Sequence, residues 1–220
     1  MRRAISIAQD AFIATRRTIR IGQTEQQIAA RLEYEMRKRG AIGPAFATIC
    51  AVDANASRPH AHAGSRKVKG GSAILIDWGA NCGFYRSDLT RVLFMGRIPP
   101  KLGRLYKIVL AAQQAAIEMI RPGERMCDVD AVARKVITDC GYGKQFGHGL
   151  GHGLGLNVHE PPSLSWRSRE RLTEGMVVTV EPGIYLRGVG GVRIEDDVLV
   201  TSTGCRVLSD LSKDLKGAVV

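Results

Sequence analysis

The stretch ILIDWGANCGFYRSDLTRV, residues 74–92, holds two acidic residues in a setting where acids are uncommon. Asp77 ends the apolar run AILI, which predicts that its backbone belongs to a buried strand. Asp88 follows eleven residues later, across a turn that contains Gly79 and Gly83, in the pattern of a hairpin. An isolated buried carboxylate is costly unless it is paired or binds a metal ion. The stretch therefore predicts a hairpin that carries a pair of functional acids.

The same pattern occurs a second time. A glycine lies six residues before Asp77, and another glycine lies six residues before Glu181, which also ends an apolar run, VVTV. A second acid follows each of these, Asp88 in the first half and Glu195 in the second. Internal repetition of this kind is evidence about the fold. It predicts that two carboxylates from each half meet at a common centre.

The order of elements is also shared between the two halves. Each half begins with a helical pattern that ends near a related stretch, IRIG at 19–22 or IRPG at 120–123, and a second helix follows. Thr24 to Gln27 has the sequence of a capping box. We predict helices over 3–19, 24–39, 101–119 and 128–140, and strands over 46–52, 72–77, 177–186 and 192–200. The chain is therefore expected to be α+β, with pseudo-repeats of about 1–97 and 98–205.

Composition is that of an ordinary globular protein, with 45% hydrophobic and 24% charged residues. No apolar run reaches the ~18 residues that a membrane helix needs, and we expect no signal peptide. Five scattered cysteines without a CxxC pair indicate reduced thiols and a cytoplasmic protein.

The net charge of +11 raises the alternative of a nucleic-acid-binding protein. The basic residues are spread along the chain, however, and their short clusters contain no interleaved aromatic residues. We interpret them as a solvated basic surface and do not expect nucleic acid as a partner.

Four acids in strand settings would make an oxygen-rich site. Two divalent ions would be held there better than one, because bridging carboxylates share their charge between the metals. A single acid at a strand end is usually a turn former or an ion-pair partner, so the prediction depends on the repeat. Asp196, next to Glu195, should face away from the site by strand alternation.

A second motif, GHGLGHGLGLNVHEPP at 147–162, contains three of the five histidines. Its alternating glycines prevent a stable helix, which excludes a zinc site of the HExxH type. In an extended chain His148 and His152 share a face, whereas His159 has the other parity and needs a bend to join them. The glycines indicate close approach of the backbone to a ligand or another segment. A flexible loop with incidental histidines is the alternative.

The two remaining histidines, His60 and His62, lie in the loop RPHAHAG before the first acid-bearing strand. One of them could reach the same centre, and the other is expected to face solvent. The spacing alone does not decide between them.

Together, IDWGANCGFYRSDLTR, GHGLGHGLGLNVHEPP, TVEPGIY and VRIEDD resemble the motif set of the pita-bread metallopeptidases, family M24. Within that family they resemble the proline-directed branch, aminopeptidase P and Xaa-Pro dipeptidase. The resemblance covers nearly the whole chain. It implies the pita-bread (creatinase/aminopeptidase) fold, internally duplicated, with a curved antiparallel sheet covered by helices. It also implies one catalytic domain over 1–220, without the N-terminal domain that such enzymes usually carry; whether Met1 is the native start is left open.

Matched by position, the resemblance assigns roles to residues of this chain. The implied metal ligands are Asp77, Asp88, His152, Glu181 and Glu195, and the second and last of these would bridge two ions. The implied catalytic residues are His60 and His159, which would stabilise the tetrahedral intermediate, and Glu181, which would relay a proton. The implied substrate-binding residues are His148, Tyr185 and Arg193.

The implied reaction is hydrolysis of the N-terminal Xaa-Pro bond of dipeptides or short peptides, by attack of a hydroxide that bridges two divalent ions. The oxygen-rich ligand set favours manganese, with cobalt, zinc and iron left open. The expected partner is a peptide with proline in second position, and a homodimer is left open. The alternatives are a methionine aminopeptidase, another reaction on the same fold such as creatine hydrolysis, or a non-catalytic binding protein.

Overall fold

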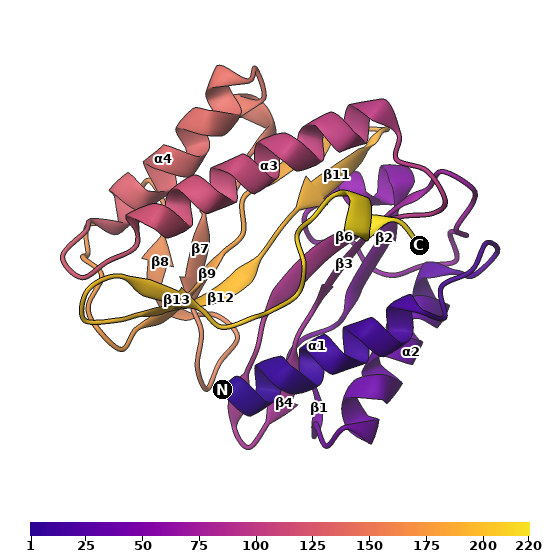
Figure 1. Ribbon diagram of the computed structural model, residues 1–220, viewed down its shortest axis with the longest axis horizontal. Helices are drawn as coiled ribbons and strands as arrows, with labels where there is room; N and C mark the ends of the chain where they lie inside the picture. Colours follow the sequence, from indigo (N-terminus) through magenta and orange to yellow (C-terminus); the bar gives the residue numbers. More distant parts are fainter.

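The computed structural model describes residues 1–220 and contains four α-helices among short antiparallel strands (Figure 1). The helices are α1 (Arg2–Arg16), α2 (Glu25–Lys38), α3 (Pro100–Met119) and α4 (Met126–Asp139), and the 3-10 helices are η1 (Asp53–Ser57), η2 (Gly143–Gln145) and η3 (Lys216–Ala218). The strands of the first half are β1 (Gly43–Pro44), β2 (Ile49–Val52), β3 (Ala73–Trp78), β4 (Ala80–Cys82), β5 (Tyr85–Arg86) and β6 (Leu89–Phe94). The strands of the second half are β7 (Gly151–Gly153), β8 (Glu160–Leu164), β9 (Val177–Val180), β10 (Gly183–Leu186), β11 (Gly190–Arg193), β12 (Asp196–Val200) and β13 (Cys205–Val207).

Two helix pairs lie on opposite sides of the strands. In Figure 1 the α1/α2 pair is at the lower right and the α3/α4 pair at the upper left, with the strands between them. The strands form sheets in the orders β2-β3-β6, β13-β12-β9-β7-β8, β1-β4-β5 and β10-β11. No helix combines the length and the apolar composition that crossing a bilayer requires.

Strand β3 shows how the two cores are separated. Its side chains alternate between faces, as the period of a strand requires. Ile74 and Ile76 belong to the core that β3 forms with α1 and α2. Leu75 belongs to the larger core, which includes α3 and α4. Both faces are buried, which explains the continuous apolar run in the sequence. Asp77 has the parity of Leu75 and so lies on the face that looks toward the second half.

Backbone hydrogen bonds recur at corresponding positions in the two halves. The N–H of Gly22 donates to the carbonyl of Val68 at 2.9 Å, and the N–H of Gly123 donates to the carbonyl of Leu172 at 2.8 Å. Both glycines have φ of +90°, in the left-handed region that glycine adopts at low cost. The duplicated IRIG and IRPG stretches therefore form the same turn, each just before the second helix of its pair.

The acid-bearing strands also correspond. Strand β3 pairs antiparallel with β6, so that Asp77 lies opposite Thr90. Strand β9 pairs antiparallel with β12, so that Val180 lies opposite Asp196. The two antiparallel pairs bring the ends of the apolar runs in both halves toward the middle of the molecule.

The predicted single strand over 177–186 is wrong. It is two strands, β9 and β10, separated by Glu181 and Pro182. Proline has no N–H for a strand ladder, which prevents the pairing from continuing. The N–H of Glu181 instead donates to the carbonyl of Leu150 at 2.8 Å, so the acid is held by the glycine-histidine stretch.

The predicted single strand over 192–200 is also wrong. It divides into β11 and β12, with Ile194 and Glu195 between them. Here Glu195 forms an isolated bridge with Thr90 of the first half, and its N–H donates to the Thr90 carbonyl at 3.2 Å. The ladder breaks because this residue pairs across the two halves. The predicted strand at 46–52 forms only from Ile49.

Close backbone packing explains two glycines of the glycine-histidine stretch, Gly151 and Gly153. A Cβ built on Gly151 would lie 1.9 Å from the carbonyl oxygen of Thr179, and one on Gly153 would lie 2.5 Å from the carbonyl oxygen of Pro161. Neither separation is physically attainable without moving backbone. The prediction that these glycines permit close approach is confirmed.

Replacing Gly151 with alanine should therefore destabilise the protein by about 1–3 kcal/mol or more, the usual cost of overpacking. The matched control is Gly147→Ala in the same stretch, where an added Cβ meets nothing within 4 Å. Urea unfolding of both variants measures the difference. Equal stabilities for the two variants would contradict the role assigned to Gly151.

Candidate metal centre

A cavity of about 330 Å³ lies between the two halves. It is in the size range of small-molecule sites, and most of the residues that line it are polar or charged. The predicted site residues that line it are His60, Asp77, Asp88, His148, His152, His159, Glu181, Arg193 and Glu195. His62 does not line it, so only the first histidine of the RPHAHAG loop reaches the site. Residues far apart in the sequence therefore share one cavity.

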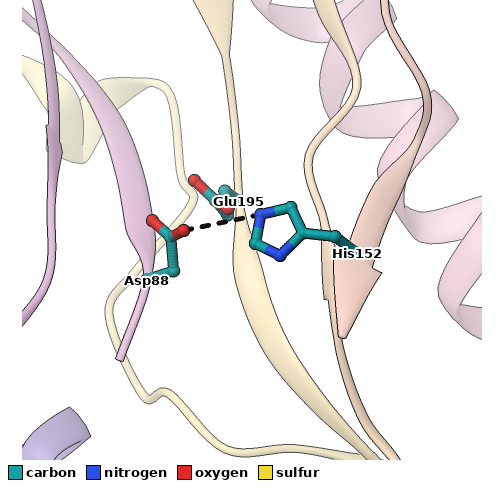
Figure 2. Close-up of side chains that lie close together, drawn as sticks. All are labelled: Asp88, His152 and Glu195. Atoms are coloured by element: carbon teal, nitrogen blue, oxygen red, sulfur yellow. Dashed lines mark ion pairs between the residues drawn. The ribbon is translucent and has the colours of Figure 1, made fainter. Parts of the chain in front are cut away.

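Asp88, His152 and Glu195 form the tightest group in the cavity. One ligand atom from each lies within 4.8 Å of the other two, a spacing suited to a shared metal ion. Figure 2 shows the three side chains pointing toward one another from separate segments of the chain. The distance from His152 Nε2 to Asp88 Oδ2 is 3.6 Å. A single histidine of the glycine-rich stretch thus joins acids from both halves.

Glu181 contacts the same nitrogen of His152 as Asp88 does. Its Oε1 lies 3.3 Å from His152 Nε2. Burial acts to raise the pKa of Glu181, but the hydrogen bond and positive charge of His152 outweigh it and lower the pKa to about 2. The pKa of His152 is raised, because the hydrogen bond and charge of Glu181 outweigh burial. In the absence of an ion, each of the two side chains therefore favours the charged form of the other.

Asp77 carries an unsatisfied oxygen. Its Oδ2 accepts a hydrogen bond of 2.5 Å from Arg193 Nη2, whereas its buried Oδ1 has no partner. A buried polar atom without a partner is rare in folded proteins and calls for an explanation. A cation in the cavity would satisfy this oxygen.

Asp88 and Glu195 are strongly affected by burial. Burial raises the pKa of each well above its usual value, and the negative charges of neighbouring carboxylates raise it further. Like charges held together without water need a compensating cation. The four carboxylates and one imidazole therefore fit divalent metal ions by charge and by ligand type.

Threonines that support the acids were not predicted. Thr90 Oγ1 donates to Glu195 Oε2 at 2.6 Å, and Thr179 Oγ1 donates to Glu181 Oε1 at 3.1 Å. Thr179 also accepts the backbone N–H of His152 at 3.0 Å. Each threonine lies two residues from a predicted ligand in the sequence, Thr90 after Asp88 and Thr179 before Glu181. Strand alternation could have identified them, since residues two apart share a face.

The two acids after Glu195 have different environments. Asp196 faces away from the cavity, as predicted, and pairs with Arg91 at 2.6 Å and Lys213 at 2.7 Å. Burial acts to raise its pKa, but the positive charge of Arg91 outweighs this and lowers it. Asp197, which was not predicted, accepts the N–H of Asp88 at 3.2 Å and holds that ligand's backbone.

A hydrogen-bonded row lies behind the acids. His148 Nε2 is 3.0 Å from the hydroxyl of Tyr185, and that hydroxyl accepts from Arg193 Nη1 at 2.6 Å. Arg193 Nε also donates to Thr90 Oγ1 at 3.0 Å. Tyr185 is buried and does not line the cavity, so it meets the site only through His148 and Arg193.

The Thr90 hydroxyl should tune metal binding, because groups that orient a ligand typically contribute 10–100-fold in metal affinity. We expect Thr90→Val to weaken Mn²⁺ binding by about this factor in isothermal titration calorimetry. The control is Thr15→Val, since the buried hydroxyl of Thr15 has no partner and lies on α1. Unchanged affinity in Thr90→Val would refute the contribution of this hydroxyl.

Above pH 4.5, the ordinary pKa of a glutamate, the opposite contribution of Glu181 is complete, and the stability of the metal-free protein should fall as the pH rises further. Groups whose pKa is raised by folding, here Asp88, Glu195 and His152, stabilise the fold at low pH and lose that contribution as the pH rises through the raised pKa. Bound Mn²⁺ compensates the ionised carboxylates and stabilises only the folded state. The gap in melting temperature between metal-loaded and metal-free protein should therefore widen with pH. A gap that narrows with pH would be inconsistent with this electrostatic picture.

Comparison with known proteins agrees with this geometry. A model of metallopeptidase family M24 matches residues 1–202. The chain is 41% identical over 213 residues to an Xaa-Pro dipeptidase of Pyrococcus horikoshii, covering 97% of this chain and 61% of that relative. Among solved structures, it is similar to the X-Pro aminopeptidase of Thermotoga maritima, with a TM-score of 0.97 and 45% identity over 100% of this chain and 62% of that one.

A prolidase from Pyrococcus furiosus is also similar, with a TM-score of 0.94 and 42% identity over 96% of this chain and 63% of that one. The chain thus spans about six tenths of the length of the relatives that it matches. The family match covers both halves of the duplicated fold and every residue that lines the cavity. The chain belongs to metallopeptidase family M24 and has the pita-bread fold of that family.

Proposed function

We propose that this chain is the catalytic unit of a metal-dependent peptidase that hydrolyses the N-terminal Xaa-Pro bond of dipeptides or short peptides. One observation carries the proposal: the five residues that match the family's metal ligands line a single cavity. The similarity to Xaa-Pro dipeptidases and an X-Pro aminopeptidase supports the choice of proline as the second residue of the substrate.

The ions would be held by Asp77, Asp88, His152, Glu181 and Glu195. We propose two ions, because the family resemblance implies that Asp88 and Glu195 are shared and their ligand atoms lie within 4.8 Å of each other. Manganese is the preferred metal, since oxygen ligands dominate the set. When bound, the ions supply Lewis-acid chemistry, polarising the substrate carbonyl and lowering the pKa of the attacking water.

Glu181 is the residue that we propose to move the proton. Its carboxylate lines the cavity beside the proposed ligand His152, with Oε1 3.3 Å from Nε2, so it is placed to accept a proton from the attacking water. The same carboxylate then donates that proton to the nitrogen of proline as the bond breaks. Thr179 holds one carboxylate oxygen, which orients Glu181 for this transfer.

His60 and His159 would bind the substrate carbonyl. Both line the cavity and both are exposed at its rim, where a peptide can meet them. The rings of His159 and His152 lie 4.2 Å apart between centroids, so His159 lies next to the proposed ligand set. Burial, and then the charge of His152, lower the pKa of His159. Donors of this kind stabilise the developing oxyanion by about 3 kcal/mol each.

Two further properties are proposed with the function. The five cysteines are unpaired, which supports a cytoplasmic protein. The possible homodimer, which the sequence left open, would be tested by sedimentation equilibrium.

The direct test is an assay of Mn²⁺-loaded protein with Ala-Pro, Ala-Pro-Ala and Met-Ala-Ala. We expect cleavage of at least one proline substrate and no cleavage of Met-Ala-Ala. Glu181→Gln should lower kcat by about 10²–10⁴-fold, as expected when a general base is lost. The control is Glu174→Gln, an exposed acid that does not line the cavity.

Absence of proline-peptide cleavage by protein with verified bound metal would overturn the proposal. Cleavage of Met-Ala-Ala alone would assign the chain to methionine aminopeptidase activity. Full activity in Glu181→Gln would leave the reaction class intact and remove the assigned role of Glu181.

A further inference from the structure

Outside the cavity, Arg134 on α4 connects its helix to the glycine-histidine stretch. Its Nε and Nη2 donate to the two carboxylate oxygens of Asp130, both at 2.9 Å. Its Nη1 donates to the carbonyl of Phe146 at 2.8 Å, and its Nη2 donates to the carbonyl of His148 at 2.9 Å. One guanidinium thus uses three nitrogens to bind both a helix and a loop.

Asp130 completes the connection from the helix side. It is fully buried, and its Oδ1 also accepts the backbone N–H of Leu150 at 3.0 Å. A two-pronged arginine–carboxylate pair is among the strongest and most directional polar interactions in proteins. Together, Asp130 and Arg134 anchor three alternate residues: Phe146, which immediately precedes the stretch, and His148 and Leu150 within it.

Aromatic rings cover the guanidinium. The Arg134 Cζ lies 4.2 Å from the ring centroid of Phe146 and 4.6 Å from that of Trp166. Contacts of this kind strengthen when they exclude water. The Arg134 side chain is 24% exposed, so the rings leave part of it open to solvent. The ring of Phe146 also contacts His148 edge to face, at 5.1 Å between centroids.

His148, the central residue of the anchored stretch, has both ring nitrogens engaged. Nδ1 lies 2.8 Å from the carbonyl oxygen of Gly149, which can only accept, so Nδ1 carries the proton. In the neutral ring Nε2 is then the acceptor, and it receives the hydroxyl proton of Tyr185. Desolvation lowers the pKa of His148, in agreement with a neutral ring.

The row of hydrogen bonds continues from this histidine to the metal centre. The Tyr185 oxygen accepts from Arg193, and Arg193 donates to Asp77, one of the proposed ligands. Residues 146–150 form no strand or α-helix, so no regular ladder holds His148 in place. The anchor from α4 supplies that constraint instead.

We propose that Arg134 and Asp130 are positioning residues: they fix the backbone around His148, so that Tyr185 and Arg193 hold Asp77 in the geometry that catalysis needs. The inference rests on the proposed peptidase function for its kinetic effect, but the positioning itself is independent of that function. Neither residue lines the cavity, so the effect on the site is indirect.

Arg134→Lys keeps the charge and removes the two-pronged geometry, and Asp130→Asn removes the charge at nearly constant volume. In Mn²⁺-loaded protein, each should lower kcat for the proline substrate by about 10–100-fold, the scale for misplaced catalytic groups. KM should rise by a smaller factor than kcat falls, because His148 belongs to the expected substrate-binding residues but the main loss is in the placement of Asp77. The matched control is Arg125→Lys, since Arg125 forms a similar two-pronged pair with Asp128 on the same helix, away from the cavity.

A second measurement does not depend on activity. Nitrogen-15 NMR of the metal-free protein reports the tautomer of His148, with His148→Gln used for assignment. The wild type and Arg125→Lys should show protonated Nδ1 and a hydrogen-bonded, unprotonated Nε2. Arg134→Lys and Asp130→Asn should show averaging of the two ring nitrogens.

Wild-type tautomer signals and wild-type kcat in both variants would overturn the proposal. Loss of the folded state in both variants would also overturn it, because the pair would then have a purely structural role. If the wild type cleaves no proline peptide, the proposed function fails, while the NMR comparison still decides whether the anchor positions His148.

Discussion

The constraint on which the rest of the structure depends is that four carboxylates lie together in one cavity. Asp77 and Asp88 come from the first half of the chain, and Glu181 and Glu195 come from the second. All four line the same cavity. Such an arrangement opposes folding unless cations compensate it, because buried carboxylates lose water and repel one another. The duplicated fold produces this arrangement, since each acid lies within or next to a strand that the hydrophobic cores hold in place. The fold thus holds the carboxylates in place, and their uncompensated negative charge favours the binding of metal ions.

The remaining polar groups around the cavity compensate part of the negative charge of the carboxylates. Arg193 neutralises Asp77 from behind, and His152 pairs with Glu181. The hydroxyl of Thr90 links Glu195 to the same arginine. These contacts fix the direction in which each carboxylate points, but they leave one oxygen of Asp77 without any partner. A ligand set that is oriented and only partly neutralised is suited to binding a cation reversibly and holding it in a defined geometry.

The sequence predicted the fold class, the four helices and the acids of the cavity, because these depend on local periodicity and on a pattern that occurs twice. It did not predict the breaks in the later strands, since Pro182 interrupts one and Glu195 leaves the other to pair with Thr90 across the molecule. The alternation of side chains along a strand predicted correctly that Asp196 faces away from the cavity. It could also have identified Thr90 and Thr179, which hydrogen-bond to the acids. The Asp130–Arg134 anchor could not be predicted, because its function depends on a tertiary contact between α4 and an irregular loop.

The central claim is that acids from both halves, with a single histidine from the glycine-rich stretch, form one metal centre. Anomalous diffraction at the manganese edge, from crystals of Mn²⁺-loaded protein, tests it most directly. The account predicts strong anomalous peaks inside the cavity, bounded by Asp88, His152 and Glu195. Peaks only elsewhere on the molecule, or coordination by His148 in place of His152, would contradict it.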